Sequence, residues 1–209
     1  MKKTDRQKYL TEEEYQKLLS VIKDGRDYML FKMTGDLGLR VGETIRLRRQ
    51  DFNFSAGYIH CPTLKQDKER KENEPKGFKI KGSIKRGELP QTYKDIAVDE
   101  DLLQQVQKYM ELYRIKTWLF PHDDGVHIPK FTAQRLFKSY VKKAKLDPVY
   151  SVHSLRHYRG FTAFNSLNDI RLVQALLRHK SISSTQVYTE VTVDKMKEAL
   201  QKIKQSKKQ

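Results

Sequence analysis

The 209-residue chain has one cysteine, only 37% hydrophobic residues and no long apolar run. A single cysteine forms no intramolecular disulfide, which excludes a disulfide-stapled secreted scaffold. No apolar stretch approaches the roughly 20 residues that cross a bilayer, and the charged residues 1–5 precede no signal-like segment. Aromatic residues at 10% argue against disorder. We therefore expect a folded, cytoplasmic protein without membrane contact, of one ordinary domain or two very small ones.

Negative charge is also scarce, with 26 acidic residues against 42 basic ones and a net charge of +16. The excess gathers in residues 65–94, 130–145 and 195–209, while the rest of the chain balances. Clustered positive charge on a folded chain is the electrostatic footprint of nucleic-acid binding. The alternative is a solvated basic surface with no specific partner.

The local patterns predict an α+β fold that is mainly helical, with a small antiparallel β-sheet. A capping box, Thr11 with Glu14, starts a first helix that we expect to end near residues 24–25. Short β-rich runs at 58–61 and 93–98 flank a charged insert, and helices follow around 102–110 and 136–144. From residue 153 onward we expect helices, with breaks near 168–169 and 180–181.

The histidines first raise the question of a metal site. His153 and His157 are four residues apart and can share one helical face, as zinc ligands do. The glutamate that turns such a pair into a hydrolase motif is missing, and the adjacent Arg156 would repel a cation. We therefore expect no metal ion.

Three motifs in order carry a stronger pattern. Arg40 stands in Gly-Leu-Arg-Val-Gly-Glu, His153 and Arg156 form His-x-x-Arg, and His179 precedes Tyr188 by nine residues. On these motifs the sequence resembles the tyrosine recombinases, or phage integrases, from about residue 10 to residue 191. The resemblance implies a tyrosine recombinase catalytic domain at 11–191. The residue pattern adds a polar arm at 1–10 and a C-terminal amphipathic helix with a basic tail at 192–209.

The resemblance gives these residues roles in breaking and rejoining DNA through a 3′-phosphotyrosyl intermediate, without any cofactor. Two arginines grip the anionic phosphate with planar, permanently charged forks. Arg40 and Arg156 match them, and Tyr188 matches the nucleophile. His153 matches the general acid/base, and His179 matches a histidine that supports the transition state.

Each of these residues also has an ordinary structural interpretation. Arg40 could form a surface ion pair with Glu43, and Tyr188 could be a packed core tyrosine. Either histidine could cap a helix or sit in the core. Glu43 matches the family's acidic residue that positions the site, and a plain helix residue is the equal alternative.

A lysine between two strands would protonate the leaving 5′-oxygen. Lys65 is the best positional match, with Lys68, Lys81 and Lys85 as alternatives. Further DNA contacts are expected from basic residues of the first two clusters: Lys81, Lys85, Arg86, Arg135, Lys138, Lys142 and Lys143.

The chain departs from the family in three places. Arg178 stands where the family usually has glycine, the insert between the strands is long, and the chain begins almost at the catalytic domain. The third departure predicts weaker or partner-assisted binding of double-stranded DNA, with an accessory DNA-binding protein as the partner. By resemblance, the chain forms a homo-oligomer, a tetramer on two DNA sites.

The resemblance makes a site-specific DNA recombinase the expected function. The alternative functions are a type IB topoisomerase-like enzyme and a non-catalytic DNA-binding relative.

Overall fold

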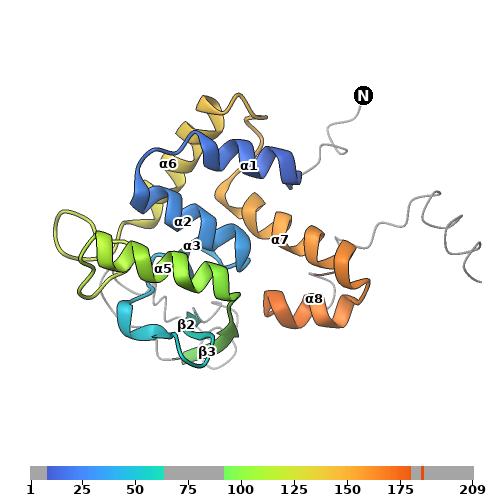
Figure 1. Ribbon diagram of the computed structural model, residues 1–209. Coiled ribbons are helices and arrows are strands. Elements are labelled where there is room, and N and C mark those ends of the chain that lie inside the picture. The colour runs from blue at the N-terminus through green and yellow to red at the C-terminus, as the bar shows by residue number, and fades with distance from the viewer. Residues whose placement is uncertain (1–8, 64–91, 180–184, 186–209) are drawn as a thin grey trace, which may run out of the picture. The chain divides into compact units, whose positions relative to one another are not determined.

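The computed structural model describes residues 9–63, 92–179 and 185 (Figure 1). Residue contacts divide the chain into two compact units, 1–159 and 160–209. The helices are α1 (Glu12–Ser20), α2 (Gly25–Asp36), α3 (Val41–Thr44), α5 (Glu100–Leu112), α6 (Lys130–Lys143), α7 (Val152–Leu167) and α8 (Ile170–Leu177). This architecture confirms the predicted mainly helical α+β fold. Within the described residues, no helix is long and apolar enough to cross a membrane.

The small sheet is antiparallel and has the strand order β1–β2–β3. A 3-10 turn, η1 (Arg49–Asp51), leads into β1 (Phe52–Asn53), which pairs with β2 (Tyr58–Thr63), and β2 pairs with β3 (Thr92–Ala97). The β2–β3 pair confirms the two predicted strands. The two-residue β1 was not predicted, because it is too short to show an alternating pattern.

Helix α1 begins as its sequence predicts. The Thr11 hydroxyl accepts from the Glu14 amide at 3.2 Å, and the Glu14 carboxylate accepts from the Thr11 amide at 2.9 Å. The predicted end near residues 24–25 was wrong, since α1 ends at Ser20. Asp24 instead caps the start of α2, where its carboxylate accepts from the Asp27 amide at 2.9 Å. Gly25 therefore begins a helix and does not end one.

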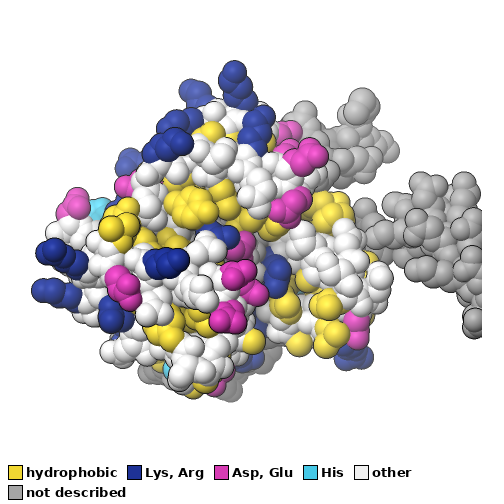
Figure 2. Space-filling view, viewed as in Figure 1, with side chains coloured by type: hydrophobic (Ala, Val, Ile, Leu, Met, Phe, Trp, Pro, Cys, Tyr) yellow, Lys and Arg dark blue, Asp and Glu magenta, His cyan; other side chains and the backbone are white. Residues whose placement is uncertain are grey.

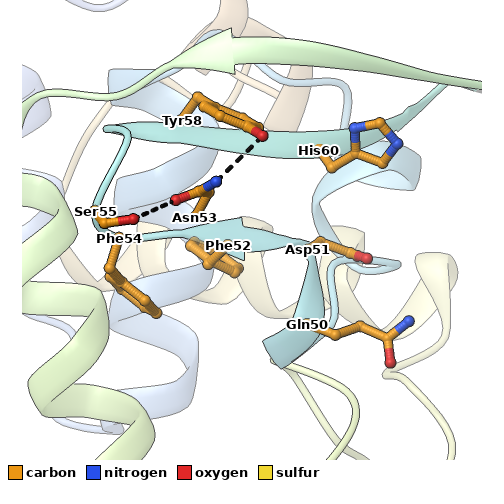
Figure 3. A pocket seen from close by; sticks show the side chains of 8 residues that line it. All are labelled: Gln50, Asp51, Phe52, Asn53, Phe54, Ser55, Tyr58 and His60. Carbon is orange, nitrogen blue, oxygen red and sulfur yellow. Dashed lines mark hydrogen bonds between the residues drawn. The ribbon is translucent and has the colours of Figure 1, made fainter.

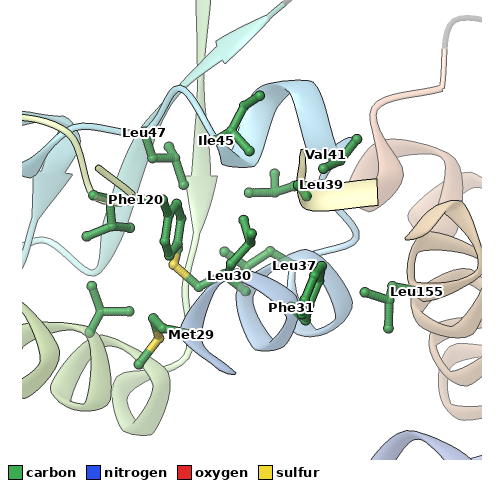
Figure 4. Close-up of a cluster of buried hydrophobic side chains, with 14 of the residues drawn as sticks. Met29, Leu30, Phe31, Leu37, Leu39, Val41, Ile45, Leu47, Phe120 and Leu155 are labelled. Atoms are coloured by element: carbon green, nitrogen blue, oxygen red, sulfur yellow. The ribbon is translucent and has the colours of Figure 1, made fainter. Parts of the chain in front are cut away.

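Helix α2 is the centre of the first unit, because it packs against α1, α3, α5 and α6. Its buried side chains meet those of the α3 region, Phe120 and Leu155 of α7 in one apolar cluster (Figure 4). Phe31 of α2 also lies edge-on to Phe137 of α6, with 5.4 Å between the ring centres. Burial of large apolar side chains dominates the stability of such a core.

Tyr15 joins α1 to α2 at a close approach. Its hydroxyl lies 2.7 Å from Asp36 Oδ1 and 3.1 Å from the Lys32 carbonyl oxygen. A Cβ at Gly35 would lie 2.6 Å from this hydroxyl oxygen. Only glycine therefore leaves room for the ring.

The second unit has its own small apolar cluster. Ala163, Val173 and Leu177 are buried there, and Phe161, Phe164 and Leu176 pack against them. Asp169 caps α8 by accepting from the amides of Arg171 and Leu172. The predicted break at residues 168–169 is confirmed as the gap between α7 and α8.

Candidate active site

The segment that joins α2 to α3 holds Arg40 in place through Glu43. Gly38 has a φ of 60°, a left-handed conformation that glycine adopts without strain. Arg40 then donates twice to Glu43: its amide lies 2.9 Å from Oε2 and its Nη1 lies 3.0 Å from Oε1. Glu43 is almost fully buried, whereas one third of the Arg40 side chain is exposed. The carboxylate thus anchors one edge of a guanidinium that still reaches solvent.

Arg156 lies against the same segment from α7. Its side chain is buried, and its Nη1 donates to the Gly38 carbonyl oxygen at 2.6 Å. The preceding residue, Leu155, is fully buried in the core (Figure 4). Burying a guanidinium is costly unless it is hydrogen-bonded, so this contact fixes where Arg156 sits. Two arginines that are 116 positions apart in the chain thereby meet one short loop.

His153 lies one turn before Arg156 and close to both arginines. The pKa of His153 is lowered from its ordinary value by partial burial of the ring, and further by the charges of Arg156 and Arg40. Its ring lies edge-on to that of His157, with 4.6 Å between the centroids. The unliganded protein therefore favours neutral imidazole beside two fixed cations, and an anion there would raise this pKa again.

His179 follows α8 in the second unit. Its amide donates to the Gln174 carbonyl at 3.0 Å, and its Nδ1 lies 2.9 Å from the Thr185 hydroxyl oxygen. Thr185 is fully buried. Our sequence reasoning missed Thr185, and the only signal for it was a hydroxyl in the run that follows His179. The contact fixes the orientation of the imidazole ring.

Arg178, the residue that departs from the family pattern, ends α8 in a left-handed conformation with a φ of 56°. Its amide donates to the carbonyls of α8, as in a helix cap that usually carries glycine. Backbone conformation thus explains why glycine is usual at this position.

Several predicted residues lie outside the described part of the chain: Lys65, Lys68, Lys81, Lys85, Arg86 and Tyr188. The four predicted residues of α6, Arg135, Lys138, Lys142 and Lys143, are all exposed. Figure 2 shows Lys and Arg side chains gathered over this helix. Lys138 also donates to the Pro148 carbonyl at 2.6 Å, so one of its three ammonium hydrogens is used within the protein.

A separate pocket of about 610 Å³ lies beside the sheet and contains none of the predicted site residues (Figure 3). Asn53 donates to the Tyr58 hydroxyl at 3.2 Å within it. His60, at its edge, pairs with Asp95 and stacks on Tyr93. The polar side chains named here thus pair with other residues of the sheet, so these contacts stabilise the sheet and give no sign of a ligand site.

Comparison with known proteins places this arrangement in a family. The phage integrase family matches residues 8–195, so the chain belongs to that family. The tyrosine recombinase XerA of Pyrococcus furiosus is 32% identical over 203 residues, which cover 93% of this chain and 61% of the relative. XerC of Oceanobacillus iheyensis is 32% identical over 201 residues, which cover 93% and 60%. The chain thus spans about three fifths of the length of these relatives.

Solved structures share the fold. A crystal structure of XerA recombinase has a TM-score of 0.69 at 23% identity, covering 93% of this chain and 64% of that one. The Tn1549 transposon integrase in complex with transposon right end DNA has a TM-score of 0.72 at 18% identity, covering 96% and 67%. XerH recombinase bound to its difH substrate has a TM-score of 0.67 at 21% identity, covering 93% and 54%. These structures confirm the fold class as that of tyrosine recombinase catalytic domains.

Proposed function

We propose that the chain carries the catalytic domain of a site-specific DNA recombinase of the integrase or invertase type. The observation that carries the proposal is the meeting of Arg40, His153 and Arg156 around one loop. Two guanidinium groups beside a neutral imidazole suit a phosphodiester, whose oxygens gain negative charge as the bond is exchanged. Family membership and the Xer relatives support the same reaction.

In the proposed reaction, Tyr188 attacks the scissile phosphorus. The new bond joins the phenolic oxygen to phosphorus, the bond to the 5′-oxygen breaks, and a 3′-phosphotyrosine with a free 5′-hydroxyl results. Arg40 and Arg156 neutralise the phosphoryl oxygens, and Glu43 holds Arg40. His153 moves the tyrosine proton, and Lys65 protonates the leaving oxygen, for which Lys68, Lys81 and Lys85 are the alternatives. His179 contributes a hydrogen bond to the phosphate.

Religation by the 5′-hydroxyl of a second strand reverses these steps. The energy of the broken bond stays in the phosphotyrosine, so the reaction requires no nucleotide. The proposed reaction also uses no metal ion.

The proposed substrate is double-stranded DNA, gripped through its phosphates by α6 and by the basic residues of the insert. We propose a catalytic domain at 11–191, flanked by the polar arm at 1–10 and a helix with a basic tail at 192–209. We also propose a tetramer on two DNA sites, assisted by an accessory DNA-binding protein. A DNA substrate makes the cytoplasm the expected compartment.

A nicked suicide substrate tests the reaction, because the short strand diffuses away after cleavage and traps the covalent intermediate. We expect a covalent protein–DNA band with the wild-type chain and none with Tyr188→Phe. Tyr113→Phe is the matched control, since Tyr113 is half-exposed on the turn after α5 and should keep the band.

Two outcomes would contradict the proposal. Relaxation of supercoiled plasmid without any specific site would indicate a topoisomerase-like enzyme. Specific DNA binding with no covalent band on any substrate would indicate a non-catalytic relative.

A further inference from the structure

The first turn of α1 receives two tyrosine hydroxyls from the segment that carries His153 and Arg156. Tyr150, two residues before α7, donates to the Glu14 carboxylate, 2.9 Å from Oε2 and 3.1 Å from Oε1. Tyr158, within α7, donates to Glu12 Oε2 at 2.5 Å. We call these four residues, Glu12, Glu14, Tyr150 and Tyr158, the α1 clasp. It brackets the two proposed site residues of α7 on either side.

Both carboxylates of the clasp are held by α1 itself. Glu14 is fixed by the capping box with Thr11, and Glu12 accepts from Gln16 Nε2 at 2.9 Å. Both acceptors are therefore held on α1 by contacts in which α7 takes no part. A tyrosine ring has few torsions to fix, so its contacts orient the helix at a small entropy cost.

The two tyrosines of the clasp are less exposed to solvent than its two glutamates. Tyr150 and Tyr158 are buried, while Glu12 is exposed and Glu14 is half-buried. The centroid of the Tyr158 ring also lies 4.3 Å from that of the Tyr15 ring, and the Tyr15 hydroxyl donates to Asp36 of α2. The clasp thus ties α7 to both α1 and α2.

The protonation states favour a lasting hydrogen bond. Burial raises the pKa of Tyr150 and Tyr158 first, and their carboxylate partners raise it further. The hydrogen bond from Tyr158 is the largest cause that lowers the pKa of Glu12. At neutral pH the protonated phenol of Tyr158 therefore meets an ionised Glu12, which makes a charge-assisted bond.

We propose that Glu12 and Glu14 are positioning residues for the DNA cleavage reaction, acting through Tyr158 and Tyr150 on the helix that carries His153 and Arg156. The inference rests on the proposed function. Its physical basis is the sensitivity of catalysis to geometry, since a misplacement of about 1 Å can cost about a hundredfold in rate. Arg156 donates to the Gly38 carbonyl while the neighbouring Leu155 stays in the core, and only a narrow range of rotations of α7 about its axis allows both contacts. The clasp fixes α7 within that range.

Single substitutions on either side of the Tyr158–Glu12 bond test the clasp. Tyr158→Phe removes the hydrogen bond to Glu12, Glu12→Gln replaces the charged acceptor with a neutral one, and both nearly keep the side-chain volume. On saturating suicide substrate, we expect each variant to form the covalent intermediate about tenfold more slowly or worse. The dissociation constant for DNA should stay within about twofold, because α6 is untouched. The double variant should be no slower than Tyr158→Phe, since that change alone already removes the bond that Glu12→Gln weakens.

Tyr140→Phe is the matched control. Tyr140 lies in the same unit, and its hydroxyl donates to Asp27 of α2 at 2.9 Å, a bond in which α7 takes no part. The control should lose about as much thermal stability as Tyr158→Phe and keep the wild-type cleavage rate. A purely structural clasp would make the two variants indistinguishable in rate, and that result overturns the inference.

A second readout separates this inference from the proposed function. If the wild-type chain forms no covalent intermediate, the proposed function fails, and amide hydrogen exchange over residues 153–158 then decides whether the clasp orders α7. We expect faster exchange there in Tyr158→Phe than in Tyr140→Phe. Equal exchange in the two variants would overturn the clasp as well.

Discussion

Arg40 and Glu43 form an ion pair and remain compatible with a phosphate site. Glu43 binds one edge of the guanidinium from a buried position, and a third of the arginine side chain stays exposed. An arginine fork has five N–H donors, so one carboxylate does not exhaust it. The two interpretations of this pair drawn from the sequence are therefore not exclusive, because the bond that orients Arg40 leaves donors for an anion.

The lowered pKa of His153 has a measurable effect on stability. Near pH 6 the folded chain binds fewer protons at this ring than the unfolded chain, so unfolding free energy rises with pH there. This contribution is complete above the ordinary histidine pKa of 6.5 and is lost as pH falls through the lowered value. We expect the free energy of unfolding, measured with urea, to fall more between pH 7.5 and pH 5.0 in the wild type than in His153→Gln.

If the free energy of unfolding falls as much or more in His153→Gln, the surroundings of the His153 ring do not hold it neutral. Added inorganic phosphate gives an independent check. If the anion binds beside Arg40 and Arg156, it raises the pKa of His153 and shrinks the difference between the two proteins.

At the scale of elements, the end of α8 carries a backbone cost. Arg178 holds a left-handed conformation, which costs an L-residue about 1–2 kcal/mol. Arg178→Gly should therefore stabilise the end of α8 by about 1 kcal/mol. Amide hydrogen exchange of residues 173–179 measures this local stability directly.

Arg178→Ala separates the backbone from the side chain. It keeps the strained conformation and removes the guanidinium, whose Nη1 lies 3.2 Å from the Leu176 carbonyl. We expect no gain in protection from this variant. Equal gains in both variants would mean that the side chain, and not the backbone, is unfavourable.

Features set by nearby residues were predictable from the sequence, and features set by distant ones were not. The capping box of Thr11 and Glu14 needs only four consecutive residues, and its prediction is confirmed. Gly25 was assigned to a helix end because glycine suits such ends, yet the cap of Asp24 makes it a helix start. Strand β1 exists only because β2 pairs with it.

The candidate site shows the same division. The motif spacing singles out His153 and Arg156, but no sequence pattern gives the contact of Arg156 with the Gly38 carbonyl, 118 positions away. The α1 clasp was not predictable from the sequence either, because the capping box already explained Glu14 and no pattern singled out Glu12. The structure does not describe Lys65 and Tyr188, so their roles remain predictions.

At the scale of the whole molecule, positive charge and most of the proposed chemistry occupy different parts of the chain, and the proposed leaving-group lysine, Lys65, is the exception. Arg40, His153, Arg156 and His179 all lie outside the three basic stretches. The stretch at 130–145 has no acidic residue, and its basic residues Arg135, Lys138, Lys142 and Lys143 are exposed on α6, over which Lys and Arg side chains gather (Figure 2). Binding strength and cleavage should therefore be separable by mutation.

The salt dependence of DNA binding tests this separation. Each phosphate contact contributes about 0.9 to the slope of log affinity against log salt. The double variant Arg135→Gln/Lys142→Gln should lower the slope by about two and keep the cleavage rate on saturating DNA. The control Lys17→Gln/Lys23→Gln changes two exposed cations outside the basic stretches and should leave the slope unchanged. Equal slopes in the two double variants would remove α6 from the DNA interface.

The close approach of Gly35 to Tyr15 links two positions that no function requires directly. Because a Cβ at residue 35 would lie 2.6 Å from the Tyr15 hydroxyl oxygen, a larger residue there displaces the ring. That ring touches Tyr158, so the displacement reaches α7. The two positions should therefore change together in evolution: a relative with alanine or serine at the position of Gly35 needs a smaller side chain at the position of Tyr15.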